Sequence, residues 1–336
     1  MNRLTSEQML LGTSHTHTYV LMTKPQLTYT PQHATFVAEV SGVDWTNINQ
    51  ELADELKSGL AKYGVLVFRD TPLTDDTHVA LARLFGPLDD VTPYNKLGRI
   101  NRLKYDELFD VSNVDADGNI IQPESLRGIM GKGNTLFHVD SSFNPRRAGL
   151  SMLLAHELPP PGTGGNTEFA DTRTAYDELT PDVKARIQDY VLWHSQFHSR
   201  RRASPGHPLL DEPRFLPESH PFGKHRLVQT HEASGRTNLY IANHAYRVDS
   251  LPIAEGRAEI DRILAHCTQP RYVHVHEWHA PGDLVIWDNT CAMHRACTGA
   301  YEGKYARDMR RATVHDTSAQ AWGLNTVGDT WRSGLP

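Results

Sequence analysis

Residues 133–143 have the sequence GNTLFHVDSSF, in which apolar and polar side chains alternate from Thr135 to Phe143. Such alternation predicts a strand. Side chains at positions i and i+2 of a strand point to the same face, so His138 and Asp140 should project together from one element. Two neighbouring ligands of one metal ion need that arrangement. The triplet alone is weak support, because a chain with 19 histidines and 40 acidic residues should contain roughly two of them by chance.

The segments around this stretch predict an early helical part and a later strand-rich part. Leu52, Leu56 and Leu60 recur at helical spacing, whereas VLVFRD (65–70) is β-branched and aromatic. On such patterns we predict helices over 51–63, 75–85, 181–191 and 251–267 and strands over 65–70, 151–158, 238–242, 271–279, 283–289 and 310–316. Few clean βαβ units are visible, which favours an α+β or jelly-roll core.

Composition excludes several classes of protein. The chain has 336 residues, with 34 Lys and Arg against 40 Asp and Glu and a net charge of −6. Mild acidity argues against nucleic-acid binding, and no apolar stretch approaches the roughly 20 residues of a membrane span. The three cysteines cannot form a disulfide framework. We therefore expect a cytoplasmic protein with no nucleic-acid or membrane partner.

Two further blocks carry chemistry downstream. WDNTCAMHRA (287–296) contains His294, and ARDMRRATV (306–314) follows it. Together with GNTLFHVDSSF and LPPPGTGGNTEFADTRTAYDEL (158–179), these blocks resemble the taurine dioxygenase and 2,4-D dioxygenase branch of the Fe(II)/2-oxoglutarate-dependent dioxygenases. The resemblance runs from about Leu27 to Thr317. It implies an α+β fold with a double-stranded β-helix (jelly-roll) core and helices packed on its outer face. We expect a flexible tail over 1–26, a single domain over 27–320 and a C-terminal tail over 321–336.

By this resemblance, His138, Asp140 and His294 are the iron ligands. Two neutral imidazoles and one carboxylate occupy one face of an octahedron and leave three positions open for co-substrate and O2. Enzymes of the family that this chain resembles often have Trp at the position of Phe137. The apolar wall is kept, but the indole N–H is lost, which suggests a different substrate pocket.

The resemblance also assigns residues to the co-substrate and the substrate. Arg307, 13 residues beyond His294, and Thr167, 27 residues beyond Asp140, match the pair that holds the far carboxylate of 2-oxoglutarate. Arg311 matches an arginine that contacts the near carboxylate or an anionic substrate. Residues 307, 309 and 311 of a strand share a face, so Arg310 should point away. Asn134 matches a position near the substrate.

The implied activity is oxidation, most commonly hydroxylation, of a C–H bond in a small molecule, with release of succinate and CO2. The cofactor would be Fe(II), with 2-oxoglutarate and O2 as co-substrates. A small anionic, carboxylate-bearing substrate is favoured by Arg311, the basic run 198–204 and the family pattern. Members of the family commonly associate, so the resemblance allows a homo-oligomer.

Other interpretations of the same residues remain open. A cupin-like isomerase or binding module could use the triad without 2-oxoglutarate. A zinc hydrolase could use HVHEWH (274–279), although this run is not H-E-x-x-H, and a structural role for His274 and His276 is favoured. The segment 193–219 is rich in His, Arg and Pro and predicts a long loop or lid, as does 94–97. Its basic run 198–204 is interpreted mainly as a solvated loop, with contact to an anionic substrate at the pocket mouth as the alternative.

Overall fold

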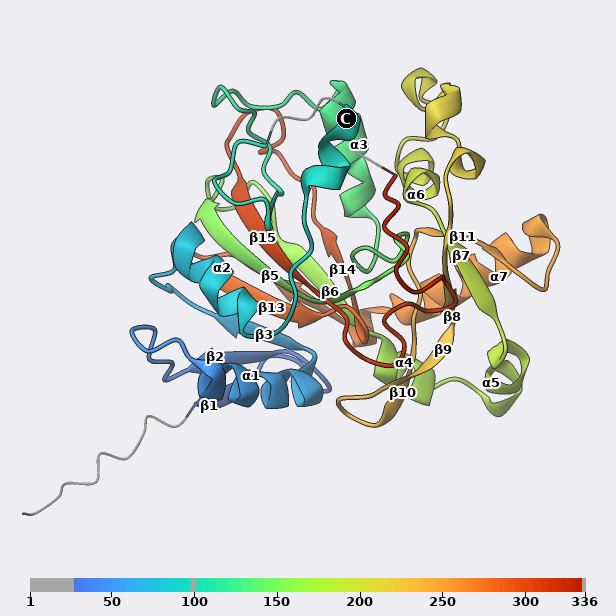
Figure 1. The fold of residues 1–336 in the computed structure, drawn as a ribbon, viewed down its shortest axis with the longest axis horizontal. Helices are drawn as coiled ribbons and strands as arrows, with labels where there is room; N and C mark the ends of the chain where they lie inside the picture. Colours follow the sequence, from blue (N-terminus) through green and yellow to red (C-terminus); the bar gives the residue numbers. More distant parts are fainter. Residues whose placement is uncertain (1–26, 98–100, 334–336) are drawn as a thin grey trace, which may run out of the picture.

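The computed structural model of the chain describes residues 27–97 and 101–333. Its largest feature is a seven-stranded sheet in the order β1–β2–β3–β13–β5–β15–β4 (Figure 1). All neighbours in this sheet are antiparallel except β2 and β3, which are parallel. Its strands are β1 (Thr28–Pro31), β2 (Ala38–Ser41), β3 (Val65–Phe68), β4 (Leu108–Asp110), β5 (Ala148–Glu157), β13 (Leu284–Asp288) and β15 (Asp308–His315).

Smaller sheets and helices complete the fold. The three smaller sheets have the orders β12–β6–β14, β11–β7–β8 and β10–β9. Their strands are β6 (Thr167–Asp171), β7 (Val191–His194), β8 (Gly223–Arg226), β9 (Val228–His231), β10 (Arg236–Leu239), β11 (Ala245–Val248), β12 (Val273–His276) and β14 (Ala292–Ala296). The helices are α1 (Gln50–Tyr63), α2 (Asp75–Arg83), α3 (Leu126–Gly131), α4 (Thr172–Asp177), α5 (Pro181–Ile187), α6 (Gln196–Ala203) and α7 (Ile253–Cys267), with 3-10 turns η1 (Thr92–Leu97), η2 (Lys132–Thr135), η3 (Pro208–Asp211), η4 (Pro213–Phe215), η5 (Pro217–Ser219) and η6 (Pro270–Tyr272).

Strand alternation divides the large sheet into two buried faces. The side chains at 66, 68, 152, 154, 284, 286, 312 and 314 pack in one core with α1 and α2. Those at 65, 67, 153, 155, 285, 287 and 309 pack in another, with Phe169 of β6 and Ala292 of β14. Successive side chains of a strand point to opposite faces, so the helices cover one face and the β12–β6–β14 sheet covers the other. The space between these two sheets contains the site described below.

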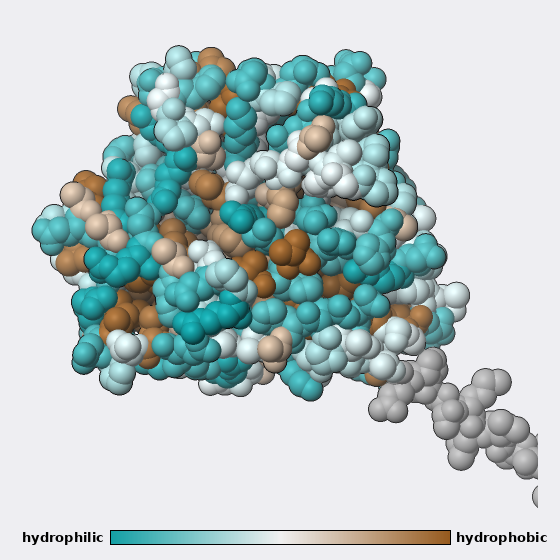
Figure 2. Space-filling view, turned by 180° about the vertical axis from the view of Figure 1, so that it is seen from behind, coloured by the Kyte–Doolittle hydropathy of each residue, from teal (hydrophilic) through white to brown (hydrophobic). Residues whose placement is uncertain are grey.

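The outer surface is mostly polar. The face opposite to that of Figure 1 is predominantly hydrophilic, with apolar side chains in small separate groups (Figure 2). Large exposed apolar side chains such as Val275 and Val327 are scattered along the chain. Within the described part of the chain, no helix combines the length and the apolar character needed to cross a bilayer.

Most of the predicted elements are confirmed, with shifted ends. Each of the four predicted helices overlaps an observed one, and α1 ends at Tyr63 with Gly64 as its C-cap, whose φ of 71° is left-handed. The six predicted strands also overlap observed strands. The N-terminal tail predicted over 1–26 lies outside the described residues. The limits of the single domain stay a prediction.

Two predicted elements are wrong. Residues 135–143 do not form a strand: Thr135 ends the η2 turn, His138 makes an isolated bridge to His294, and Ser141 has a positive φ of 55°. The segment 193–219 is not a simple loop, because it contains the end of β7, α6 and three 3-10 turns. Its buried residues in α6 are mainly polar, so no apolar period marks the helix in the sequence.

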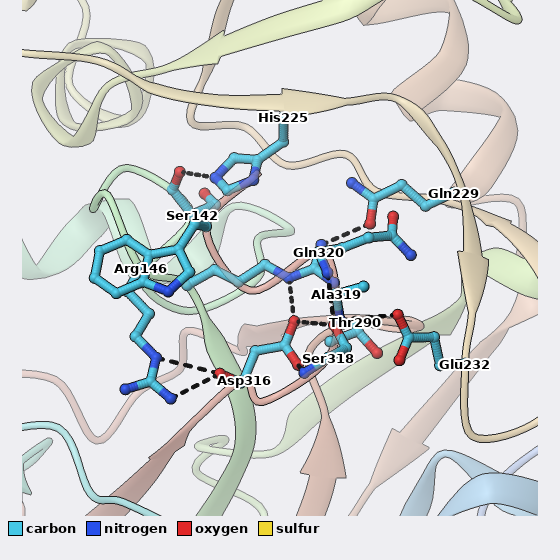
Figure 3. Close-up of polar contacts among 12 residues, drawn as sticks. Ser142, Arg146, His225, Gln229, Glu232, Thr290, Asp316, Ser318, Ala319 and Gln320 are labelled. Atoms are coloured by element: carbon cyan, nitrogen blue, oxygen red, sulfur yellow. Dashed lines mark hydrogen bonds and ion pairs between the residues drawn. The ribbon is translucent and has the colours of Figure 1, made fainter. Parts of the chain in front are cut away.

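A buried ion pair fixes the start of the chain that follows β15. Asp316 accepts a hydrogen bond from Arg147 Nε at 2.7 Å, and Figure 3 shows Arg146 and Ser318 bonded to the same residue. The side chains of Arg147 and Asp316 are only 2% and 7% exposed. Gln320 and Ala319 then continue the contacts to Thr230 and Glu232 in and beside β9.

Removing one partner of this ion pair should lower the stability of the fold. We expect Asp316→Ala to lower the free energy of unfolding by about 3–5 kcal/mol, because it leaves the Arg147 guanidinium buried without a counter-charge. Urea unfolding measures the change. Glu124→Ala, which breaks the exposed pair of Glu124 with Lys132, is the control and should change stability little. Equal losses in both variants would contradict the prediction.

Candidate active site

Two histidines and one aspartate converge between the large sheet and the β12–β6–β14 sheet. His294 lies on β14, and its backbone exchanges two hydrogen bonds, of 2.8 and 2.9 Å, with that of His138. His138 Nε2 lies 3.9 Å from Asp140 Oδ1, and His294 Nε2 lies 3.7 Å from Asp140 Oδ2. The three side chains are buried, and their potential ligand atoms lie within 4.8 Å of one another. The structure therefore brings together the triad predicted from the sequence.

The position of Asp140 is fixed by residues that the sequence reasoning missed. Its Oδ2 accepts from the Ser151 hydroxyl at 2.8 Å, and its backbone N–H donates to Asn289 Oδ1 at 2.9 Å. Asn289 also donates to Ser151 Oγ and accepts from the Trp287 indole N–H. Such outer contacts orient a metal ligand. Asn289 belongs to the WDNTCAMHRA block (287–296), so the family resemblance could have pointed to it. No motif in the sequence marks Ser151 as a site residue.

The protonation states of the triad suit a divalent metal. Burial lowers the pKa of His138 to about 4 and that of His294 well below its usual value. Burial alone would raise the pKa of Asp140, but Arg311 and the two histidines outweigh it and lower the pKa to about 2. His138 Nδ1 lies 2.7 Å from the Leu136 carbonyl, which assigns the proton to Nδ1 and leaves the Nε2 lone pair for a metal. Two neutral imidazoles and one carboxylate, with a cavity beside them, fit a first-row divalent ion with open positions.

The adjoining cavity has a volume of about 90 Å³ and contains the predicted co-substrate residues. Arg307 and Thr167 both line it and are buried. Arg307 Nε donates to the Gly165 carbonyl at 3.1 Å, and the Trp278 indole N–H donates to Thr167 Oγ1 at 3.1 Å. No ion pair is made by Arg307 among the described residues. Its guanidinium is thus fixed at one end and available to an anion at the other.

The glycine-rich loop explains how Arg307 fits. A Cβ atom on Gly165 would lie 3.3 Å from Arg307 Nε, and the φ of Gly165 is 89°. Only glycine adopts this conformation readily and leaves the guanidinium this space. The GTGG run at 162–165 therefore provides the space that the Arg307 side chain occupies.

Arg311 and Asn134 also line the cavity, but each already has a partner. Arg311 Nη1 lies 2.5 Å from Asp140 Oδ1, and its Nε donates to Thr313. Asn134 Oδ1 accepts from Arg200 Nη1 at 3.3 Å. Arg310 points to the other face of β15 and pairs with Asp75, as predicted. Arg311 therefore neutralises the carboxylate of the triad in this structure.

Several cavity residues were not predicted as site residues. Arg200 and Gln196 of α6, together with His244, Tyr94 and Phe109, line the cavity around the triad. Arg200 belongs to the basic run that was interpreted mainly as a solvated loop, and this is wrong because the residue is 7% exposed. Its place in the cavity wall agrees with the alternative interpretation of the run. Tyr94 belongs to one of the predicted lids and is buried, with its hydroxyl bonded to Asp89. His274 and His276 lie on β12 and do not line the cavity.

A second cluster of His231, Asp288 and Cys291 has metal-ligand residue types and is buried. His231 Nε2 lies 2.9 Å from Asp288 Oδ2. Burial would lower the pKa of His231, but Cys291 and Asp288 outweigh it and raise the pKa to about 10. The other ring nitrogen, Nδ1, lies 2.6 Å from the Ser234 hydroxyl, so both nitrogens of His231 are engaged in hydrogen bonds. The contrast with His138 and His294 leaves the first cluster as the candidate metal site.

Comparisons of sequence and of structure relate the chain to known proteins. The family model described as "Taurine catabolism dioxygenase TauD, TfdA family" matches residues 27–313. The alpha-ketoglutarate-dependent 2,4-dichlorophenoxyacetate dioxygenase of Cupriavidus pinatubonensis is 38% identical over 289 residues, which are 85% of this chain and 96% of that protein. The (S)-phenoxypropionate/alpha-ketoglutarate-dioxygenase of Sphingobium herbicidovorans is 32% identical and covers 81% of this chain and 90% of its own length. The crystal structure of AAD-2 in complex with Mn(II) and N-oxalylglycine superposes with a TM-score of 0.79 at 39% identity, over 87% of this chain and 98% of that one.

Proposed function

This chain belongs to the TauD/TfdA family of dioxygenases, and on that premise we propose how its site residues share the work. The protein is an Fe(II)- and 2-oxoglutarate-dependent oxygenase. His138, Asp140 and His294 hold the iron, which when bound activates O2 for oxidation of a substrate C–H bond with release of succinate and CO2. The observation that carries this assignment is the buried triad of two neutral imidazoles and one carboxylate beside an open cavity. The cupin-like and zinc-hydrolase alternatives are not favoured by these relatives.

The chain's own residues position the reactants. The Ser151 and Asn289 contacts hold Asp140 in place, and Arg311 compensates its charge. Arg307 and Thr167 bind the far carboxylate of 2-oxoglutarate, since a buried guanidinium without an ion-pair partner favours a bidentate carboxylate. The inner faces of the large sheet and the β12–β6–β14 sheet form a double-stranded β-helix around these residues. The ring centroids of Phe169 on β6 and Trp287 on β13 lie 5.6 Å apart, and this contact supports the packing of the two sheets against each other.

The primary substrate is a small carboxylate-bearing molecule of the aryloxy acid type. The relatives named above act on 2,4-dichlorophenoxyacetate and (S)-phenoxypropionate. Apolar and aromatic side chains, including Val91, Phe109 and Phe143, line the cavity next to its arginines. Pockets of this kind bind an apolar body through their walls and orient it through a few polar groups.

An anaerobic titration tests the co-substrate assignment. Iron-loaded protein should give the visible metal-to-ligand charge-transfer band when 2-oxoglutarate is added without O2. We expect Arg307→Met to weaken 2-oxoglutarate binding by about 100-fold or more, because a buried charge pair is typically worth 2–5 kcal/mol. Arg310→Met, on the opposite face of the same strand, is the control and should bind 2-oxoglutarate normally. Equal affinity in Arg307→Met and wild type would overturn the role of Arg307, and no band in the iron-loaded wild type would overturn the proposed function.

A further inference from the structure

One cation of the cavity has no assigned task. Arg200 projects from α6 and is 7% exposed. Among the described residues its side chain makes one hydrogen bond, a long one of 3.3 Å from Nη1 to Asn134 Oδ1, and its buried Nε has no partner. Burial lowers its pKa to about 10, so the guanidinium stays charged at neutral pH. A buried cation without a counter-ion is costly, which points to a ligand that supplies the charge.

The backbone opposite Arg200 is shaped to accept it. A Cβ atom on Gly133 would lie 1.8 Å from Arg200 Nη1 and 2.7 Å from its Cζ. Gly133 is not among the residues with positive φ, so close approach of the guanidinium is the reason for a glycine here. The η2 turn that contains Gly133 packs directly on α6. The arginine therefore rests on a flat piece of backbone and does not move freely in the cavity.

The other charged groups of the cavity are already committed. Arg311 is paired with Asp140, and Arg307 lies with Thr167 at the 2-oxoglutarate position. The two remaining wall carboxylates, Asp89 and Glu107, are paired with Arg332 and Arg83. Arg200 is left as the uncommitted cation, and it lies close enough to feel the charges of both Asp140 and Arg311.

A second polar group on the same helix face also lacks a partner. Gln196 precedes Arg200 by four residues, so both side chains lie on one face of α6. Gln196 is 1% exposed, lines the cavity, and its amide oxygen has no hydrogen-bond partner. Buried polar groups are normally hydrogen-bonded, so a pair of uncommitted ones facing a cavity indicates a ligand contact.

We propose that Arg200, supported by Gly133 and Asn134, binds the carboxylate of the primary substrate. This inference rests on the proposed function, and it assigns substrate recognition to α6 in place of Arg311 on β15. Arg200 and Asn134 also line a neighbouring cavity of about 200 Å³, whose walls include Ile121, Pro123 and Met130. The carboxylate held at their junction fixes which end of the substrate faces the triad, and the apolar body lies against Phe109 and Val111, which both cavities share.

The test compares a carboxylic acid with its neutral counterpart. Phenoxyacetate and phenoxyacetamide are offered to the iron-loaded enzyme with saturating 2-oxoglutarate, and succinate release is measured against each concentration. In Arg200→Met we expect the apparent KM for phenoxyacetate to rise about 30-fold or more and the preference for the acid over the amide to disappear. The 2-oxoglutarate affinity, measured by the anaerobic band, should change less than about threefold because Arg307 is intact.

Three further variants make the result specific. Arg200→Lys should restore part of the acid preference, since it keeps the charge but not the bidentate geometry. Gly133→Ala displaces the guanidinium without removing it and should weaken acid binding even if Arg200→Met folds poorly. Arg201→Met, on the outward side of α6 where Arg201 pairs with Asp211, should behave as wild type.

The outcomes separate this inference from the proposed function. An unchanged acid preference in Arg200→Met, with the anaerobic band intact, would overturn the role of Arg200 alone. The same conclusion follows if wild type itself does not prefer phenoxyacetate over phenoxyacetamide. Absence of the band in wild type would overturn the proposed function and the inference with it.

Discussion

His294→Ala should lose iron and turnover together. Mutating residues that merely support a metal ligand typically costs 10–100-fold, so we expect removal of a ligand to lower succinate release by about 1,000-fold or more. The backbone should survive the change, because the two hydrogen bonds between His138 and His294 are made by main-chain atoms. Iron content after anaerobic loading and succinate release under saturating co-substrate are the two measurements.

The control for this variant lies in the same small sheet. His274 of β12 and His294 of β14 are both register partners of Phe169 on β6, but His274 does not line the cavity. His274→Ala should therefore keep its iron and its turnover. If His294→Ala retained one equivalent of iron and near-normal turnover, the triad would not be the metal site.

The strands that build the site could be predicted because the apolar pattern that marks each of them lies within the strand itself. Residues 65–68, 152–155 and 284–287 are continuous apolar runs, as expected for strands buried on both faces. The triad could be identified from its residue types and spacing, although the predicted strand over 135–143 is wrong. His138 and Asp140 meet because a single bridge to β14 and the left-handed Ser141 place them, and neither feature has a pattern in the sequence.

Arg200 shows why other site residues could not be predicted. It is one of three consecutive arginines, and its neighbours Arg201 and Arg202 make surface ion pairs with Asp211 and Asp261. Only the packing of α6 on the η2 turn distinguishes the buried arginine from its two partly exposed neighbours. Contacts between segments more than sixty residues apart decide this, and composition alone favours a solvated loop.

Buried histidines should make the fold sensitive to acid, and His78 is the clearest case. It lies in α2, is fully buried, and places Nε2 3.1 Å from the Met152 carbonyl. Burial lowers its pKa to about 4 from the usual 6.5. Above pH 6.5 both folded and unfolded chains carry a neutral imidazole. As the pH falls from 6.5 towards 4, the unfolded chain takes up a proton that the folded chain does not, so stability is lost.

The single histidine should cost about 2 kcal/mol of unfolding free energy at pH 5 relative to pH 7.5. His78→Gln keeps a donor for the Met152 carbonyl but does not titrate, so its stability should fall by about 2 kcal/mol less than that of wild type between these pH values. Urea unfolding at both pH values measures the difference. If His78→Gln lost as much stability as wild type, protonation of other groups would account for the acid sensitivity, and His78 would not contribute to it.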